Sequence, residues 1–475
     1  MIFRALSATC PAGAGLLSAV TVSMVIMAID ARATAADYTT LLADIDTIRK
    51  NYGVPAVGFS LTDKNRVLWS GALGVTDIKT RRPVTPQTRF RIGSITKAFT
   101  GLAALALQED GKLRLSDPIA RWVPAGLYHN PWAQTHPIRV AHLLEHTAGF
   151  TDMSPAEFDH NIPIAALPAL ALHPQSRRAR WPPGYHASYS NSGAGLAGLI
   201  IEQLADQSYE TFVERRLLQP LAMANTGFSP HRQLAQGYQA DGIEPIPYWH
   251  ILFRPAGAIN STPRDMAAFV RLLLNNGRHR GRQLLAPASV ARMEKPATTL
   301  AAKSGLNHGY GLGVYQWLHN GFRFHGHGGD GDGYLAHFGY NRDSGLGYFV
   351  VVTVFNHRPL REIRTKIEDH IVRNLPAPVK PIAADSAVPL KRYEGSYHPV
   401  TYRFGERPER DEKLKVFLRD GKLHTRINKR RSRPLIAVNG GHFRRPGDTV
   451  ATMAFVEAQG EMYLQADFGN YRRER

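Results

Sequence analysis

Two hydrophobic periodicities run along the chain and divide it into helices and strands. From 95 to 107 almost every residue is apolar, a pattern that predicts a helix buried on nearly every side. Alternating segments at 56–61 and 67–72 predict paired strands. The runs at 322–328 and 348–355 predict two more, of which the second is apolar enough to be buried on both faces.

Helical patterns fill the sequence between these strands. We expect helices at about 37–51, 263–275 and 362–375, and a mostly helical region with long loops from about 117 to 226. The chain of 475 residues is long enough for two or more folding units, and its 43% apolar and 20% charged content is that of an ordinary globular protein. We expect the first unit to span residues 36–375.

A change of composition separates this unit from the end of the chain. Residues 376–385, which begin with Pro376-Ala377-Pro378, predict a stiff linker. Residues 386–475 then contain short β-patterned runs separated by Asp-Gly, Gly-Gly and Pro-Gly turns, which predict a small antiparallel β-barrel or sandwich. The clearest runs are Leu414 to Leu418, Leu423 to Ile427, Thr449 to Val456 and Glu461 to Ala466.

The first 35 residues predict an export signal peptide. Arg4 supplies a positive start, Leu16 to Ile29 is mostly apolar, and Ala33-Thr34-Ala35 offers small residues for cleavage before Ala36. We therefore expect a periplasmic or secreted protein. An uncleaved membrane anchor is the alternative, because the apolar run is long for a signal. The one cysteine, Cys10, lies inside this segment, so no disulfide or catalytic thiol is expected in the mature chain.

The chain is strongly basic, with a formal charge of +19. Residues 386–475 contribute to this excess, since they hold 19 Lys and Arg against 11 Asp and Glu. For an exported protein this charge predicts an anionic envelope surface as a partner, and no nucleic acid is expected. A basic surface that serves only solubility is the alternative.

The helix at 95–107 starts with a pair of residues suited to acyl transfer. Ser94 and Lys97 are three apart, so on a helix the hydroxyl and the amine lie within hydrogen-bond reach. Burial favours the neutral form of a lysine, which can then accept the serine proton. The free N–H groups of a helix start can stabilise negative charge on an acyl oxygen. Serine and lysine are common, so this pair alone also agrees with chance.

Two further polar clusters follow in the sequence. Tyr189 and Asn191 precede an apolar helix, where a nearby cation would lower the proton affinity of the tyrosine and the amide could hold a substrate carbonyl. His327, Gly329 and Asp330 lie on and just past a predicted strand, where glycine lets a ligand backbone approach and the next N–H can complete an oxyanion hole with that of the serine. A helix cap and a flexible glycine turn are the alternatives.

Together the three clusters resemble the active-site motifs of the serine β-lactamase and penicillin-binding protein superfamily, nearest its class C branch. The resemblance covers about 37–375 and extends to the D-aminopeptidase, DD-peptidase and esterase relatives. It rests on Ser94-x-x-Lys97, Tyr189-x-Asn191 and His327-x-Gly329, in that order and at these separations, and on the similar segments 111–118, 143–149, 219–223 and 261–266.

The resemblance implies an α+β fold, in which a five-stranded antiparallel sheet is flanked by helices beside a helical subdomain and the site lies between them. It also implies roles for the matching residues. Ser94 would be acylated, Lys97 would activate it, Tyr189 would relay protons, and Asn191 would bind the substrate amide. The N–H groups of Ser94 and Asp330 would bind the oxyanion. No metal or organic cofactor is required.

One departure from the family pattern affects the substrate. The third motif of most β-lactamases is Lys-Thr-Gly, whose cation and hydroxyl help to bind the substrate carboxylate, whereas this chain has His327 and Gly328 in the first two positions. A mostly neutral histidine and a glycine predict weaker anion binding, which argues against an efficient β-lactamase. His-Gly-Gly resembles instead the motif of D-aminopeptidases. We therefore hypothesise that Asp330 or Asp332 meets a substrate ammonium group.

The sequence thus predicts an exported serine hydrolase that forms an acyl-enzyme on Ser94 with a small amide or ester. A D-amino-acid peptide, such as one from peptidoglycan, and a carboxylic ester are the favoured substrates. A weak β-lactamase and a penicillin-binding sensor that is acylated without turnover, or binds only envelope polymer, are alternatives. A further alternative comes from His142, Glu145 and His146, whose spacing matches an inverted zinc peptidase with both histidines on one helix.

Overall fold

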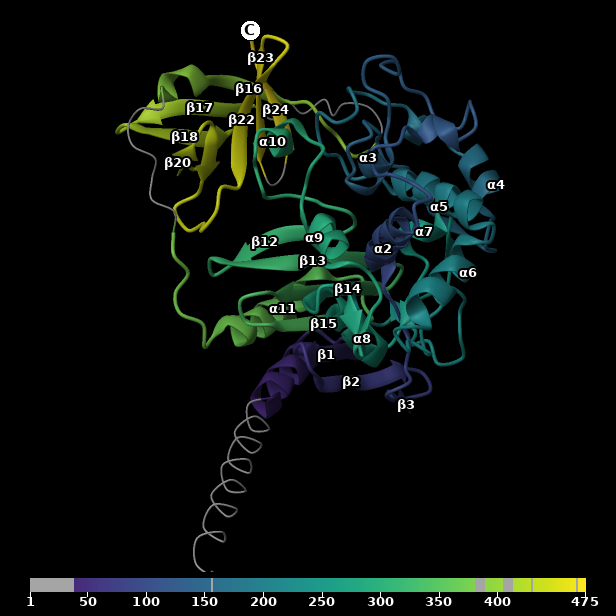
Figure 1. Ribbon diagram of the computed structural model, residues 1–475. Coiled ribbons are helices and arrows are strands. Elements are labelled where there is room, and N and C mark those ends of the chain that lie inside the picture. The colour runs from purple at the N-terminus through teal and green to yellow at the C-terminus, as the bar shows by residue number, and fades with distance from the viewer. Residues whose placement is uncertain (1–37, 155–156, 381–388, 405–412, 429, 467–468) are drawn as a thin grey trace, which may run out of the picture.

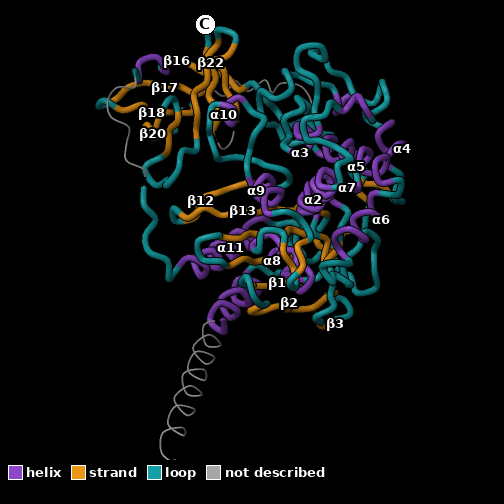
Figure 2. The backbone as a smooth tube through the Cα atoms, in the orientation of Figure 1, coloured by secondary structure: helices purple, strands orange, loops and turns teal. Residues whose placement is uncertain are grey.

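The computed structural model describes residues 38–154, 157–380, 389–404, 413–428, 430–466 and 469–475. The signal peptide expected at 1–35 and the part of the expected linker from 381 to 385 lie outside the described residues. Figure 1 shows a central sheet with a helical region beside it and a second, C-terminal sheet above. In Figure 2 the helices gather mainly on the side of the helical region, whereas the C-terminal part consists mostly of strands and loops.

The central sheet is antiparallel and has seven strands in the order β12-β13-β14-β15-β1-β2-β3. It confirms the predicted antiparallel sheet with two strands more than the five that the resemblance implied. Val57 of β1 pairs with Val352 of β15, so segments from both ends of this unit meet in the middle of the sheet. The strands are β1 Ala56–Thr62, β2 Val67–Asp77, β3 Arg82–Pro83, β12 Tyr315–His319, β13 Phe322–Gly331, β14 Tyr334–Asn341 and β15 Leu346–Val352.

Helices cover both faces of this sheet. Phe349 and Val351 of β15 pack in one core cluster, and Tyr348, Val350 and Val352 pack in the other, which confirms that this apolar run is buried on both faces. The helix 38–51 and α11 (His357–Val372) cover one face, while α2 (Thr96–Glu109) and α8 (Pro263–Leu274) belong to the cluster on the other.

The helical subdomain shares a hydrophobic core with the α2 side of the sheet, because its apolar residues pack together with those of α2. Among the described residues, none of the helices is both long and apolar enough to cross a bilayer. The helices of this region are α3 Val140–Leu144, α4 Ala166–Ala171, α5 Asn191–Ala205, α6 Tyr209–Val213 and α7 Arg254–Gly257, and α9 Pro287–Glu294 and α10 Leu300–Lys303 follow later in the chain. Two-residue strands also form four small two-stranded sheets, which are β4 (Phe90–Arg91) with β9 (Asn260–Ser261), β5 (Asp159–His160) with β8 (His250–Ile251), β6 (Gly237–Tyr238) with β7 (Pro245–Ile246), and β10 (Arg278–His279) with β11 (Arg282–Gln283).

The C-terminal sheet has nine strands in the order β19-β18-β17-β16-β24-β23-β22-β21-β20. Its two end strands, β19 (Arg433–Pro434) and β20 (Ile436–Asn439), are neighbours in sequence, so the sheet curls into a nearly closed barrel. It has its own aromatic core around Tyr397 and Phe455. The other strands are β16 Gly395–Pro399, β17 Leu414–Arg419, β18 Lys422–Ile427, β21 His442–Arg444, β22 Met453–Ala458, β23 Glu461–Ala466 and β24 Gly469–Arg473.

Candidate active site

Ser94 lies in a single turn that leads into the central helix α2. Gly93–Ile95 form a 3-10 turn, and Lys97 stands in the first turn of α2. The amine Nζ of Lys97 is 3.1 Å from Oγ of Ser94, so the predicted pair is in hydrogen-bond contact. Gly93 has a φ of +52°, and a Cβ there would lie 2.5 Å from the carbonyl oxygen of Asp330. Only glycine suits this position, which ties the serine turn to β13.

Lys97 is buried, with 3% of its surface exposed. Burial lowers its pKa from 10.5 to about 7, and the Asp152 carboxylate opposes this shift. Besides Ser94, the amine donates to Oδ1 of Asn191 at 2.6 Å and to the carbonyl of Ala256 at 2.8 Å. Three acceptors suit the ammonium form while burial favours the neutral amine, so a pKa near 7 leaves both forms populated at neutral pH.

Tyr189 lies over the serine–lysine pair. Nζ of Lys97 is 4.9 Å from the centre of its ring, and the imidazole of His146 packs against it at a tilt of 37°, with ring centres 4.2 Å apart. Burial raises the pKa of the phenol, and a hydrogen bond from Ser94 and the charge of Arg403 only partly oppose this rise. The expectation that a neighbouring cation lowers its proton affinity is therefore wrong in its net direction, because burial outweighs the Arg403 charge and the Ser94 hydrogen bond. Tyr189 is a neutral phenol at physiological pH.

Asn191 begins α5 and connects Lys97 to a buried carboxylate. Its Nδ2 donates to Oδ2 of Asp152 at 3.0 Å, and its backbone N–H donates to Oδ1 of Asp152 at 2.9 Å. Its Oδ1 accepts from Lys97. The side chain thus orders the site itself. Its contact with a substrate amide remains a prediction.

The third motif lies on the edge of β13. β12 pairs with β13 only as far as Gly326, and among the described residues no strand partner continues along that edge from 327 to 331. A Cβ on Gly329 would lie 1.9 Å from the carbonyl oxygen of Ile92 and 3.2 Å from the nitrogen of Ser94. The backbone of Asp330 therefore lies beside that of Ser94, as the predicted oxyanion hole requires.

His327 and the two aspartates have different environments. His327 is buried with Tyr310 at 2.6 Å from its Nε2, and burial, together with the charge of Lys97, lowers its pKa to about 3. It therefore supplies no positive charge. The Asp330 side chain is exposed, whereas Asp332 forms an ion pair with Arg91 at 3.4 Å.

The residues of the zinc-like spacing do not share one helix. α3 ends at Leu144, and His146 has a left-handed backbone with a φ of +58°, so it lies off the helix and against Tyr189. Glu145 forms an ion pair with Arg292 and accepts from the backbone of Thr298 at 2.9 Å. The geometry that the zinc interpretation needs is absent, because the two histidines and the glutamate face different partners.

A cavity of about 780 Å³ opens beside Tyr189, and both parts of the chain line it. Tyr310 and Trp317 contribute from the part of the chain before the linker, and Tyr402 and Arg403 contribute from the C-terminal part. Neither Arg403 nor Asp152 was predicted from the sequence as a residue of the site. A lone charged residue has no periodicity, and the only signal for Asp152 was its place just after the family-like segment 143–149.

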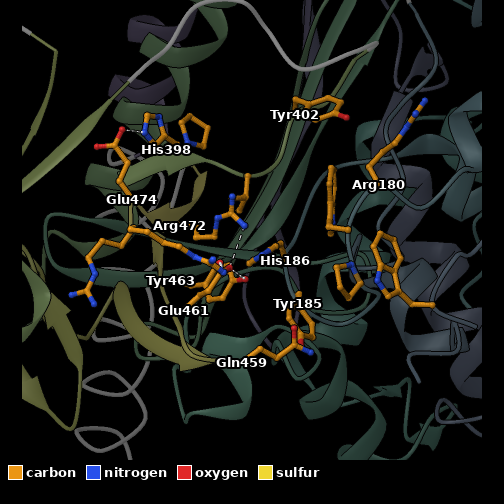
Figure 3. Close-up of a pocket in the computed structure, with 17 residues that line it drawn as sticks. Arg180, Tyr185, His186, His398, Tyr402, Gln459, Glu461, Tyr463, Arg472 and Glu474 are labelled. Atoms are coloured by element: carbon orange, nitrogen blue, oxygen red, sulfur yellow. Dashed lines mark hydrogen bonds and ion pairs between the residues drawn. The ribbon is translucent and has the colours of Figure 1, made fainter. Parts of the chain in front are cut away.

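A second cavity, of about 970 Å³, lies across the Tyr402 segment from the first. Figure 3 shows Tyr185 and His186 from the part of the chain before the linker, and Glu461, Tyr463 and Arg472 from the C-terminal sheet near them. Neither Ser94 nor any other residue of the three motifs lines it. The first cavity, by contrast, is lined by Tyr189 and by His146, which packs against Tyr189.

Fold and site together define a class of α+β proteins in which a serine–lysine pair lies between an antiparallel sheet and a helical subdomain. This is the serine β-lactamase and penicillin-binding protein superfamily. The beta-lactamase family matches residues 41–371, and the chain belongs to that family. The resemblance inferred from the three motifs is thereby confirmed.

Relatives and solved structures agree with this assignment. Protein flp of Staphylococcus aureus (strain MRSA252) is 27% identical over 229 residues, 47% of this chain and 46% of that protein, so the chain matches about half of its length. Protein Rv1367c of Mycobacterium tuberculosis (strain ATCC 25618 / H37Rv) is 30% identical over 302 residues, 54% of this chain and 71% of that protein.

The octameric penicillin-binding protein homologue from Pyrococcus abyssi has a TM-score of 0.61 and 22% identity, and the match covers 92% of this chain and 100% of that one. A beta-lactamase/D-alanine carboxypeptidase from Yersinia pestis has a TM-score of 0.58 and 21% identity, over 71% and 99% of the two chains. EstCE1, a hydrolase with promiscuous acyltransferase activity, has a TM-score of 0.57 and 21% identity, over 70% and 99%. These three likenesses show the fold.

Proposed function

We propose that the protein is a serine hydrolase that forms an acyl-enzyme on Ser94. The observation that carries this proposal is the contact of 3.1 Å between Ser94 Oγ and the buried amine of Lys97, whose pKa is about 7. At neutral pH a large fraction of this amine is unprotonated and can take the serine proton while Oγ attacks a substrate carbonyl carbon. The N–H groups of Ser94 and Asp330 would stabilise the resulting oxyanion.

Collapse of this intermediate needs a proton on the leaving amine or alcohol. Tyr189 is a neutral phenol next to the serine, so it can donate that proton and recover one from Lys97. The Oγ–carbonyl ester then forms as the scissile bond breaks. In the second half-reaction, water attacks the ester and gives its proton to the same groups. These return a proton to Ser94 Oγ as the Oγ–carbonyl bond breaks and the acid leaves.

The substrate class that we propose is a small amide or ester, with D-amino-acid peptides and carboxylic esters favoured. Proteins that share this fold include a beta-lactamase/D-alanine carboxypeptidase and a hydrolase with promiscuous acyltransferase activity. The neutral His327 and the glycine after it leave the third motif without the cation that favours a β-lactam carboxylate. Weak β-lactamase activity and a slowly acylated sensor use the same serine and are the alternative outcomes of the test.

We further propose that the protein acts in the periplasm or outside the cell, on the basis of its first 35 residues. Its excess of basic residues favours an anionic envelope surface as a neighbour, and peptidoglycan fragments as a source of short peptides. Fractionation of cells that express the full chain, with N-terminal sequencing of the product, tests both statements. Cleavage before Ala36 with recovery outside the cytoplasm is the expected result.

The test of the catalytic proposal is intact mass after exposure to a fluorophosphonate and to a penicillin. The full chain and a Ser94→Ala variant are compared, and turnover is then measured on D-alanyl amides, short-chain esters and nitrocefin. We expect adducts only on the chain that retains Ser94, and turnover on amides or esters. A penicillin adduct without product release favours the sensor, and a chain that neither probe labels rejects the nucleophile assignment.

The hypothesis about Asp330 and Asp332 concerns selectivity within this class. Asp330 is exposed at the end of β13, where a carboxylate can pair with the amine of a substrate. The Asp330→Asn and Asp332→Asn double variant should lose preference for amine-bearing over neutral substrates by about tenfold. Equal selectivity in the variant and the unmodified chain would reject the hypothesis.

A further inference from the structure

A short segment of the C-terminal part reaches the catalytic network. Residues 400–404 run past the active-site loops, where the backbone of Asp152 donates to the carbonyl of Arg403 and bridges to Phe404. The hydroxyl of Ser188 donates to the carbonyl of Tyr402 at 3.1 Å. These contacts hold the segment through its backbone, so the Arg403 side chain is delivered to a fixed place.

The Arg403 side chain meets the carboxylate of Asp152, whose own side chain has no exposed surface. Nε and Nη2 of Arg403 lie 3.2 and 3.1 Å from Oδ2 of Asp152. A buried carboxylate needs a cation and hydrogen bonds to stay ionised. Burial raises the pKa of Asp152, while the Asn191 N–H, Arg403 and Lys97 oppose that rise. Arg403 is thus a principal counter-ion of this carboxylate.

Asp152 in turn determines which way the Asn191 amide faces. Because the carboxylate accepts from Nδ2, the other end of the amide, Oδ1, points at Lys97 and accepts from it at 2.6 Å. The opposite orientation would set an amide oxygen against the carboxylate and an N–H₂ group against the lysine. A continuous chain of contacts therefore runs from Arg403 through Asp152 and Asn191 to Lys97.

We propose that Arg403 and Asp152 are positioning residues, which fix the Asn191 amide against Lys97, so that the serine–lysine pair is fully competent only when the C-terminal segment is seated. This inference rests on the proposed role of Ser94 and Lys97. It makes the C-terminal sheet a part of the catalytic apparatus, although its residues need not touch the reacting atoms.

The charges around Lys97 give the expected direction of the effect. Asp152 and Asp330 favour its ammonium form and Arg403 disfavours it. The other titratable groups against it are His146, His327 and Tyr189, whose ordinary pKa values are displaced by burial so that all three are neutral near pH 7. Loss of Arg403 alone leaves Asp152 less compensated, so the pKa of Lys97 should rise. Loss of the Asp152 charge should lower it.

The test measures the rate of fluorophosphonate labelling at Ser94 as a function of pH, by intact mass, on the full chain. Below the pKa of Lys97 the rate follows the fraction of neutral amine, so a limb moved by one pH unit changes the rate at fixed pH by about tenfold. We expect the acid limb of Arg403→Gln to move to higher pH, and that of Asp152→Asn to move to lower pH with a reduced plateau.

Arg392→Gln is the matched control. Its side chain is 48% exposed, like the 47% of Arg403, and pairs at 3.2 Å with Glu457, a residue of β22. Its profile should equal that of the unmodified chain. If Arg403→Gln does not fold by circular dichroism, Arg403→Lys replaces it. Lysine keeps the charge without the two-point contact, so the plateau should fall while the limb moves less.

The outcomes separate this inference from the proposed function. Suppose that the unmodified chain is labelled, and that the Arg403 and Asp152 variants have the same acid limb and the same plateau rate as the unmodified chain. The positioning role is then wrong, and the nucleophile assignment stands. If the unmodified chain is not labelled at Ser94 at any pH, the proposed function fails and this inference fails with it.

Discussion

The two sides of the candidate active site are built in different ways. The inner wall, by which we mean the serine turn and β13, is held by backbone contacts so close that Gly93 and Gly329 have no room for a side chain. The outer wall, formed by Tyr402 and Arg403, is held by a half-exposed ion pair and a few hydrogen bonds. Steric fit therefore determines the position of the first wall, whereas an ion pair and hydrogen bonds determine that of the second.

Among the changes considered, removal of the lysine amine beside the inner wall should lower the acylation rate most. Lys97→Ala takes away the group that accepts the serine proton, so acylation should slow by about 10²–10⁴-fold. Lys366→Ala is the control, since this lysine is half exposed and pairs with Asp44 at 3.2 Å, away from the site. Single-turnover acylation rates test the prediction. Equal rates for both variants would remove Lys97 from the mechanism.

A methyl group on Gly329 should displace the inner wall itself. Its Cβ would lie 1.9 Å from the carbonyl oxygen of Ile92, so β13 and the serine turn must move apart. We expect Gly329→Ala to lose about 100-fold in kcat/KM and about 1–3 kcal/mol in the free energy of unfolding. Gly447→Ala, where no atom lies within 4 Å of the added Cβ, should match the unmodified chain in both. Kinetics and urea unfolding measure the two effects.

The pH dependence should report the lysine and not the histidine of the inner wall. Burial lowers the pKa of Lys97 to about 7, so kcat/KM should rise about tenfold per pH unit up to pH 7. Above pH 7 it should level off, because most of the lysine is then in its neutral form. His327, with a pKa of about 3, is already neutral throughout this range. A His327→Gln variant should therefore keep the position of the limb, and a limb that disappears in that variant contradicts the assignment.

The smallest effect on the kinetic constants is expected when only the aromatic surface of the outer wall is changed. Tyr402 packs edge-on against Trp181 with ring centres 5.7 Å apart and lines the cavity. Tyr402→Ala should raise KM by about two- to fivefold with little change in kcat. Tyr402→Phe keeps the ring and should restore the KM. A large fall in kcat for the alanine variant would show that this wall, too, is held by steric fit.

The same contrast explains what the sequence could predict. The helix α2 was predictable because it is apolar on nearly every side, and the strand β15 was predictable because it is apolar on both faces. β14 was missed although all eight of its residues are buried, since His337, Gly339 and Asn341 interrupt its apolar pattern. Two of the strands in the C-terminal sheet, β16 and β24, were missed because glycine, proline and arginine hide their alternation.

The motif residues could be predicted from the sequence because each stands in a short local pattern, and the structure brings Ser94, Lys97, Tyr189 and Asn191 together. The pair of Asp152 and Arg403 could not be predicted in this way. These residues are 251 positions apart in sequence, and their interaction depends on how the C-terminal segment docks. A buried ion pair of this kind follows from tertiary packing, which no local periodicity records.

The pairing of β1 with β15 has a consequence for how the chain reaches its native state. The backbone N–H of Ala56 bonds to the hydroxyl of Thr353, across 297 positions of sequence. Until β15 has been synthesised, β1 can pair only with β2, and a lone two-stranded hairpin is marginally stable in water. Contacts this distant slow folding, because a long loop must close before they form. The middle of the central sheet therefore forms late, and a chain stopped before residue 346 would present β1 as an unpaired edge.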